Sequence, residues 1–170
     1  MSRQEITGFT LLELMVIIAI LAILVTLALP SFQSTLRSNR VATASNELLA
    51  SLSLARSEGI RSTRGGGVCT SANGTACGGN WNDGWIVWTD ANGNGVLDEG
   101  ETVTRYSAGK PQLQLGGSAA ATTIAFDGRG RIKGSSQPAI NIAPKGAADP
   151  VRCINIGATG QVRMAKVACP

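Results

Sequence analysis

The segment "ITGFTLLELMVIIAILAILVTLALPSF", residues 6–32, decides the fold of this 170-residue chain. Between Phe9 and Leu29 it contains no glycine, no proline and one charged residue, Glu13. A helix of this length spans about 30 Å, the thickness of the hydrocarbon layer of a bilayer. The segment therefore predicts a membrane-spanning helix with a carboxylate near one end, where an unpaired charge is costly.

Two ordinary explanations leave part of this segment unaccounted for. A cleaved secretory signal peptide has an apolar core of about 7–15 residues followed by a small-residue cleavage site. Here the apolar run is longer and ends in Leu29-Pro30-Ser31-Phe32, without such a site. A plain single-span anchor accounts for the composition but gives no reason for Glu13.

The residues around Glu13 resemble the class III signal of type IV pilins and of the pseudopilins of type II secretion. Gly8 closes a short polar leader, Phe9 follows it, Glu13 is the fifth residue counted from Phe9, and the apolar run ends at Pro30. The resemblance implies that a prepilin peptidase cuts after Gly8 on the cytoplasmic side and methylates the new amine of Phe9. It also implies that Glu13 pairs with the N-terminal amine of a neighbouring subunit. Such pairing recovers much of the cost of a charge in hydrocarbon.

A second helical pattern follows the apolar run. Apolar residues recur at spacings of three and four, at Val41, Ala44, Leu48, Leu52 and Ala55. We therefore expect the helix to continue past Pro30, which would kink it, and to pack its second half on a head domain. The expected divisions are a leader at 1–8, a transmembrane and assembly helix at 9–29, an amphipathic half at 30–59 and a β-rich head at 60–170.

The periodicity changes after Gly59. Short β-type runs alternate with turns rich in Gly, Asn and Asp, and the predicted strands are 85–89, 102–106, 112–115, 122–126, 139–142, 152–156 and 161–164. One long helix followed only by strands predicts an α+β, pilin-like fold with an antiparallel sheet.

The head also resembles the FimT, FimU and GspH group of minor pilins and pseudopilins. The resemblance lies in "GWIVWTDANGNGVLDEGE", "IAFDGRGRI" and "CINIGATGQVRM". It implies a minor pilin, a structural subunit that helps prime, cap or decorate a type IV pilus. The implied partners are other major and minor pilins, the prepilin peptidase and the inner-membrane assembly machinery. The paired cysteines and the basic C-terminal half favour a pilus over a pseudopilus of type II secretion, which is the alternative.

The implied location is the bacterial inner membrane, with a single span and a periplasmic head, before assembly into an extracellular pilus or a periplasmic pseudopilus. We expect no enzyme, because the sequence lacks histidine, a nucleophile–base pair and a phosphate-binding loop. No cofactor is certain from the sequence.

Four cysteines suit an oxidising compartment and allow three pairings. Cys69 and Cys77 bracket a short loop, and Cys153 precedes Cys169 near the end of the chain. We predict disulfides Cys69–Cys77 and Cys153–Cys169. Metal binding is the alternative, although there is no CxxC and no histidine.

"DANGNGVLDEGE" matches a calcium loop. Counting from Asp90, the candidate ligands at positions one, three, five, seven, nine and twelve are Asp90, Asn92, Asn94, Val96, Asp98 and Glu101. Strands flank the segment where an EF-hand has helices, and Asn-Gly dipeptides are a strong hairpin signal. A plain hairpin turn is therefore the alternative to bound calcium.

Basic residues outnumber acidic ones from Arg105 onward. Arg129, Arg131 and Lys133 alternate, so on a strand they would point the same way and could clamp DNA phosphates without sequence specificity. FimT proteins bind DNA during natural transformation through a G-R-x-R motif near the C-terminus. Residues 128–131 spell that motif earlier in the chain. The later stretch that corresponds to it, residues 160–163, reads Gly-Gln-Val-Arg, with Gln161 in place of the first arginine of the motif. A DNA-binding minor pilin is therefore a second alternative. The other explanation of these basic residues is a solvated strand edge without a binding function.

Overall fold

The structure, a computed structural model, describes residues 9–116, 122–134, 137–147 and 149–170. The chain divides into two compact units, one up to Arg37 and one from Ser38 onward. A single helix, α1 (Leu11–Ser62), contributes to both and includes Pro30 in its interior. Helix continuity past Pro30 is therefore confirmed, while the kink at this proline stays a prediction.

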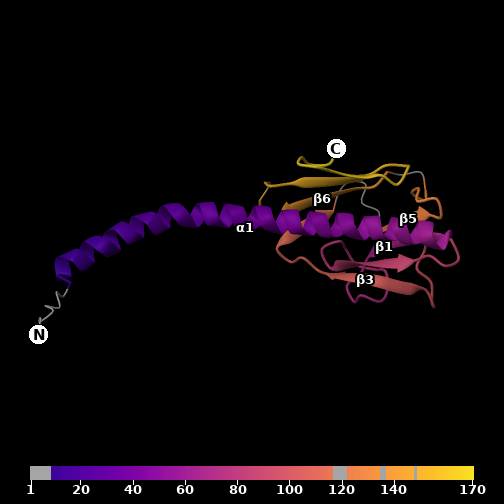
Figure 1. The fold of residues 1–170 in the computed structure, drawn as a ribbon, viewed down its shortest axis with the longest axis horizontal. Coiled ribbons are helices and arrows are strands. Elements are labelled where there is room, and N and C mark those ends of the chain that lie inside the picture. The colour runs from indigo at the N-terminus through magenta and orange to yellow at the C-terminus, as the bar shows by residue number, and fades with distance from the viewer. Residues whose placement is uncertain (1–8, 117–121, 135–136, 148) are drawn as a thin grey trace, which may run out of the picture. The chain divides into compact units, whose positions relative to one another are not determined.

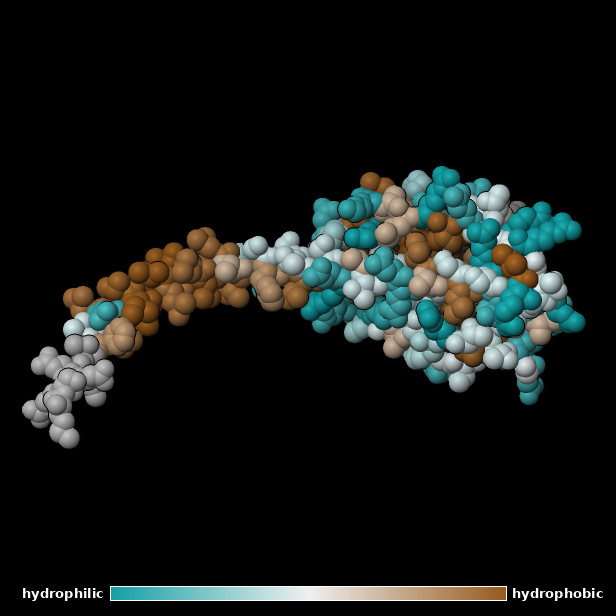
Figure 2. Space-filling model, in the orientation of Figure 1, coloured by the Kyte–Doolittle hydropathy of each residue, from teal (hydrophilic) through white to brown (hydrophobic). Residues whose placement is uncertain are grey.

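The first unit consists of the apolar part of α1. Its large apolar side chains are exposed, from Phe9 at 77% to Leu27 at 70% and Phe32 at 62%. Figure 2 shows this part of the helix as a mainly hydrophobic surface, with one hydrophilic patch near its N-terminal end. Among the described residues, α1 is the helix with the length and apolarity needed to cross a membrane.

The second half of α1 supplies the helical layer of the head. The five residues of the predicted stripe, Val41, Ala44, Leu48, Leu52 and Ala55, are all buried. In Figure 1 this half of α1 passes in front of the head, with β6 on one side and β3 on the other. The helical period in the sequence therefore predicts the buried face correctly.

Among the described residues, eight strands follow α1 and form two antiparallel sheets. The strands are β1 (Gly65–Thr70), β2 (Gly84–Thr89), β3 (Thr102–Ala108), β4 (Leu113–Gly116), β5 (Thr123–Asp127), β6 (Ala139–Pro144), β7 (Arg152–Ile156) and β8 (Val162–Ala165). Sheet A has the order β3-β2-β1-β5, and sheet B has the order β4-β6-β7-β8. The fold class is α+β as predicted, with two sheets in place of one.

β1 is the strand that the sequence prediction misses. It begins with three glycines, which favour turns, yet it lies between β2 and β5 in the middle of sheet A. A Cβ atom on Gly66 would collide with the Ala55 carbonyl of α1, and one on Gly67 would collide with the Trp88 ring. These glycines therefore allow α1 and the Trp88 ring to pack closely against β1, and they do not mark a turn.

One hydrophobic core joins the helix and both sheets. Sheet A contributes Val68, Trp85, Val87, Ile124 and Phe126, and sheet B contributes Leu113, Leu115, Ile140, Ile142, Ile154 and Ile156. A smaller cluster of Cys69, Ile86 and Trp88, with Leu97 and Val103, involves alternate residues of β1 and β2. Because successive strand residues face opposite ways, this cluster lies on the other face of sheet A.

Candidate functional site

The start of α1 carries residues predicted for processing and assembly. Gly8 lies outside the described residues, and Phe9 is exposed just before the helix. The Glu13 N–H donates to the Thr10 hydroxyl at 3.2 Å, an N-cap, and Glu13 lies in the first turn, where the helix dipole favours negative charge. The Glu13 carboxylate has no hydrogen bond or ion pair within the described part of the chain. It is thus available to a second subunit, although cleavage at Gly8 and pairing of Glu13 stay predictions.

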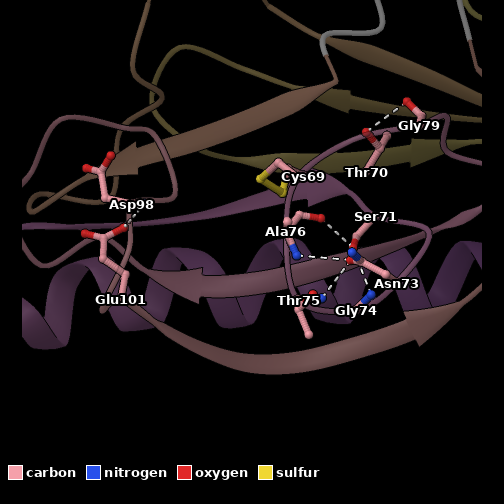
Figure 3. The surroundings of a disulfide bond; sticks show 11 residues. Cys69, Thr70, Ser71, Asn73, Gly74, Thr75, Ala76, Gly79, Asp98 and Glu101 are labelled. Carbon is pink, nitrogen blue, oxygen red and sulfur yellow. Dashed lines mark hydrogen bonds between the residues drawn. A yellow bond between two sulfur atoms is a disulfide. The ribbon is translucent and has the colours of Figure 1, made fainter.

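The first disulfide joins Cys69 on β1 to Cys77 in the loop before β2. Figure 3 shows how Asn73 organises this loop: its side-chain oxygen accepts the N–H groups of Thr75 at 3.0 Å and Ala76 at 3.1 Å. The loop is therefore held by a covalent bond and by its own hydrogen bonds.

The second disulfide joins Cys153 on β7 to Cys169 in the C-terminal tail. The Cys169 N–H also donates to the side-chain oxygen of Asn141 on β6, at 2.6 Å. Both pairings are those predicted from the sequence. Because no cysteine is free, no thiolate is left for the metal site considered as the alternative.

The predicted calcium loop is the hairpin loop between β2 and β3. Asp90 is fully buried. One of its carboxylate oxygens accepts the N–H groups of Gly93 at 2.7 Å and Asn94 at 3.1 Å, and the other accepts that of Gly95 at 2.8 Å. The turn is thus built around the Asp90 carboxylate.

The other candidate calcium ligands are also engaged within the loop. The amide groups of Asn92 and Asn94 donate to one oxygen of Asp98 at 2.7 and 2.6 Å. The Glu101 carboxylate accepts the N–H groups of Ala91 at 2.7 Å and Asp98 at 3.1 Å. Figure 3 shows Asp98 and Glu101 beside each other. Within the described residues, no three acidic, Cys or His side chains are gathered as for a metal. Calcium binding stays a prediction.

Arg129, Arg131 and Lys133 lie after β5 and not on a named strand, so the row that they would form on one face of a strand is not present. β5 ends at Asp127, and the Asp127 carboxylate accepts the N–H groups of Arg129 at 2.9 Å and Arg131 at 2.8 Å, which bends the chain into a turn. Arg131 is paired with Asp127 through Nε at 3.1 Å. The Lys133 ammonium donates to the Gly93 carbonyl in the β2–β3 loop. The expected row of three solvated cations is therefore absent from this segment.

The same contacts set the acidity of Asp127. Its partial burial by itself raises the pKa of the carboxyl group. The N–H donors of Arg131 and Arg129 and the Arg131 guanidinium outweigh this effect, so the pKa of Asp127 lies below its ordinary value. The turn therefore depends on an ionised Asp127.

Arg56 lies on α1 next to the last residue of the apolar stripe, Ala55, and was not among the candidate site residues. Its guanidinium donates to the Gly130 carbonyl at 2.9 Å and to the Thr159 carbonyl at 3.2 Å, which joins the turn after β5 to the turn before β8. The fourth candidate DNA contact, Arg163, lies on β8, is exposed and donates to Gln161 at 2.9 Å. No pattern in the sequence indicates that Arg56 connects the turn after β5 to the turn before β8.

A shallow groove of about 350 Å³ lies beside Arg56. Its lining residues are Leu49, Ser53, Arg56, Ser57, Ile60, Gly160, Gln161 and Val162. A second hollow of about 560 Å³ on sheet B is lined by Gln137, Asn155, Gly157, Gln161, Arg163, Met164 and Ala165. Neither hollow contains a carboxylate or a nucleophile–base pair that could carry out acid–base chemistry.

Comparison with known proteins places these features in a family. A family model described as "Type II transport protein GspH" matches residues 44–160, which extend from the second half of α1 to the turn before β8. The search of curated proteins returns no match.

Solved structures of pilins and pseudopilins share the fold. Two crystal forms of the type IV minor pilin FimU from Pseudomonas aeruginosa match with TM-scores of 0.58 and 0.60 at 22% identity, covering 73% and 75% of this chain and 91% and 90% of theirs. The minor pseudopilin EpsH of the Vibrio cholerae type 2 secretion system matches with a TM-score of 0.50 at 18% identity, covering 74% of this chain and 94% of its own. At these identities the likeness concerns the fold.

Proposed function

We propose that this chain, which belongs to the GspH family of type II transport proteins, is a minor pilin that helps prime, cap or decorate a type IV pilus. It has the apolar N-terminal helix and the disulfide-linked α+β head of pilin-like subunits, which are structural rather than enzymatic. Within this family, we assign the chain to a type IV pilus, with cleavage by prepilin peptidase and other pilins as its partners.

One observation carries the proposal: within the described residues, the first part of α1 is exposed along its whole length. The large apolar side chains between Phe9 and Leu36 are exposed, and in water each would cost about 1.5–3 kcal/mol relative to burial. A membrane supplies that burial before assembly, and the helices of other major and minor pilins supply it in a fibre. This supports an inner-membrane precursor with a periplasmic head that the assembly machinery moves into a pilus.

Glu13 supports the same order of events. Its carboxylate has no partner within the described residues and belongs to a residue four positions after the exposed Phe9. If prepilin peptidase cuts after Gly8, the amine of Phe9 becomes a cation that a neighbouring subunit offers to Glu13. Assembly would then lower the free-energy cost of the unpaired Glu13 carboxylate in the membrane, because it supplies the pairing cation.

Fractionation of surface fibres tests the proposal. Fibres sheared from cells of the source organism should contain this chain with Phe9 as its N-terminus, in far smaller amounts than the major subunit. Deleting the gene should reduce the number of surface pili. A deletion strain with normal pili and no chain in the sheared fraction would contradict the proposal.

A pseudopilin is the first alternative, favoured by the family description and by the match to EpsH. In that case the deletion would spare pili and block export of folded proteins to the medium. Scoring pili and secretion in the same deletion strain therefore separates the two roles.

A DNA-binding pilin is the second alternative. It has less support than the scaffold role because Arg131 is paired with Asp127 and Lys133 contacts the β2–β3 loop. Arg129 and Arg163 are exposed and could still contact phosphates without sequence specificity.

A further inference from the structure

We propose that Lys133 is the cation of the β2–β3 loop: its ammonium group neutralises the buried Asp90 and closes the loop without a bound metal ion. The inference concerns the head alone and does not depend on the proposed function. It assigns a role to the one basic residue of the "GRGRIK" segment that turns back into the protein.

Asp90 requires a nearby positive charge. Its side chain is fully buried, and its two oxygens accept three backbone N–H groups, from Gly93, Asn94 and Gly95. These neutral donors solvate the carboxylate only in part, and a buried charge without a counter-ion is strongly destabilising. Nζ of Lys133 lies 3.6 Å from Oδ2 of Asp90, so this ammonium is the counter-ion.

The Lys133 side chain is held in place along its length. Its backbone N–H donates to the Ala125 carbonyl of β5 at 2.8 Å. Its Cδ lies 3.2 Å from the position that a Cβ on Gly95 would occupy, so the aliphatic stem runs over the turn. Its ammonium then donates to the Gly93 carbonyl. The lysine thus bridges the segment after β5 and the hairpin loop.

The loop has a second basic contact, from Arg64. Arg64, between α1 and β1, donates through its guanidinium to the Ala91 carbonyl at 2.5 Å. Together Arg64 and Lys133 supply positive charge to an acidic loop that also contains Asp98, Glu99 and Glu101. The Asp98 and Glu101 carboxylates accept hydrogen bonds from within the loop. Both carboxylate oxygens of Asp90 and of Glu101 therefore accept hydrogen bonds within the loop, and a lysine lies beside the buried Asp90.

Hydrogen exchange measured by mass spectrometry on the full chain in detergent tests the role of Lys133. The N–H groups of Gly93, Asn94 and Gly95 report on the loop, because they donate to Asp90. In Lys133→Gln we expect the peptide covering these amides to exchange about tenfold faster, since the buried carboxylate loses its counter-ion. Lys133→Arg, which keeps the charge, should retain most of the protection.

Two controls keep this test specific. Lys145→Gln removes an exposed lysine after β6 and should leave the loop unchanged. Peptides from sheet B should exchange at the wild-type rate in every variant, which excludes general unfolding. Equal protection in Lys133→Gln and Lys145→Gln would overturn the proposal, and so would equal loss in Lys133→Gln and Lys133→Arg.

Calcium supplies an independent outcome. Millimolar calcium added to the wild-type chain should leave exchange of the loop unchanged, because Lys133 already fills the role of the cation. Slower exchange in the wild type on adding calcium would overturn the proposal, because a metal ion would then be the cation of this loop.

Discussion

Single carboxylates, on Asp90 and Asp127, organise two turns of the head. Asp127 lies in the turn after β5. It accepts the N–H groups of Arg129 and Arg131 and pairs with the Arg131 guanidinium. These contacts hold its folded-state pKa below the ordinary value of 3.8. A group of this kind contributes stability that is present above the unfolded pKa and is lost as pH falls through the folded pKa.

We therefore predict that thermal stability falls between about pH 4 and pH 2, in part because Asp127 becomes protonated. Asp127→Asn should lower stability at pH 7 by about 1 kcal/mol and should remove this part of the acid dependence. Melting of the full chain in detergent as a function of pH is the measurement. The control is Glu99→Gln, at an exposed position. If Asp127→Asn and the wild type lose stability in parallel below pH 4, Asp127 has no such role.

At the scale of elements, β1 depends on glycines that permit close packing. Gly67 faces the Trp88 ring with no room for a Cβ atom, whereas Gly78, in the loop before β2, has open space there. Gly67→Ala should destabilise the head by about 1–3 kcal/mol through overpacking. Gly78→Ala is the matched control, because both changes reduce the entropy of the unfolded chain alike. Equal melting temperatures for the two variants would contradict this account of β1.

The elements that follow a hydrophobic period were predictable from sequence. The stripe from Val41 to Ala55 and the strands β2 to β8 all show in the pattern of apolar residues. β1 could not be found this way, because the reason for its glycines lies in Ala55 and Trp88, on other elements. The turn after Asp127 agrees with the Asp-Gly turn signal at residues 127–128, whereas alternation of basic residues has a consequence only on a strand.

The candidate sites also contain features that could be predicted from the sequence and features that could not. The disulfides were predictable because spacing and compartment limit the pairings. Arg56 and the pairing of Lys133 with Asp90 were not, since each joins segments that are distant in sequence and no local pattern records such contacts. The spacing in the β2–β3 loop matches a calcium loop and its Asn-Gly dipeptides match a hairpin turn, and neither pattern indicates that Lys133 lies beside Asp90.

At the scale of the whole molecule, processing should be separable from assembly. Gly8→Ala should leave an uncleaved precursor of higher mass, because the residue at the cleavage site is changed. Mass spectrometry of the membrane fraction measures the N-terminus. Detection of a mature chain beginning at Phe9 in this variant would reject the processing model.

Glu13→Ala should behave differently from Gly8→Ala. It should be cleaved and inserted normally, since removing a charge makes membrane insertion easier. It should be depleted from sheared fibres, because the attraction for the amine of the next subunit is lost. Immunoblots of membrane and fibre fractions compare the two steps. Wild-type amounts of the variant in the fibres would show that Glu13 is not needed for assembly.

The net charge of the molecule makes the DNA alternative testable. With 15 Lys and Arg against 11 Asp and Glu, the chain carries a formal charge of +4, so weak attraction to any duplex is expected whatever its function. Four phosphate contacts at Arg129, Arg131, Lys133 and Arg163 would give a slope of log affinity against log salt of about −4. Because Arg131 and Lys133 are paired with Asp127 and Asp90, we expect a slope of about −2.

Variants of the two neighbouring arginines decide between these slopes. Arg129→Gln should flatten the slope by about one unit, whereas Arg131→Gln should change it little, because its guanidinium is already held by Asp127. Fluorescence anisotropy of a labelled duplex, titrated with the full chain in non-ionic detergent over a salt series, measures both. Equal flattening by the two variants would mean that Arg131 leaves Asp127 to bind phosphate. The head would then present the cation row that its resting geometry lacks, and the DNA-binding role would gain over the scaffold role.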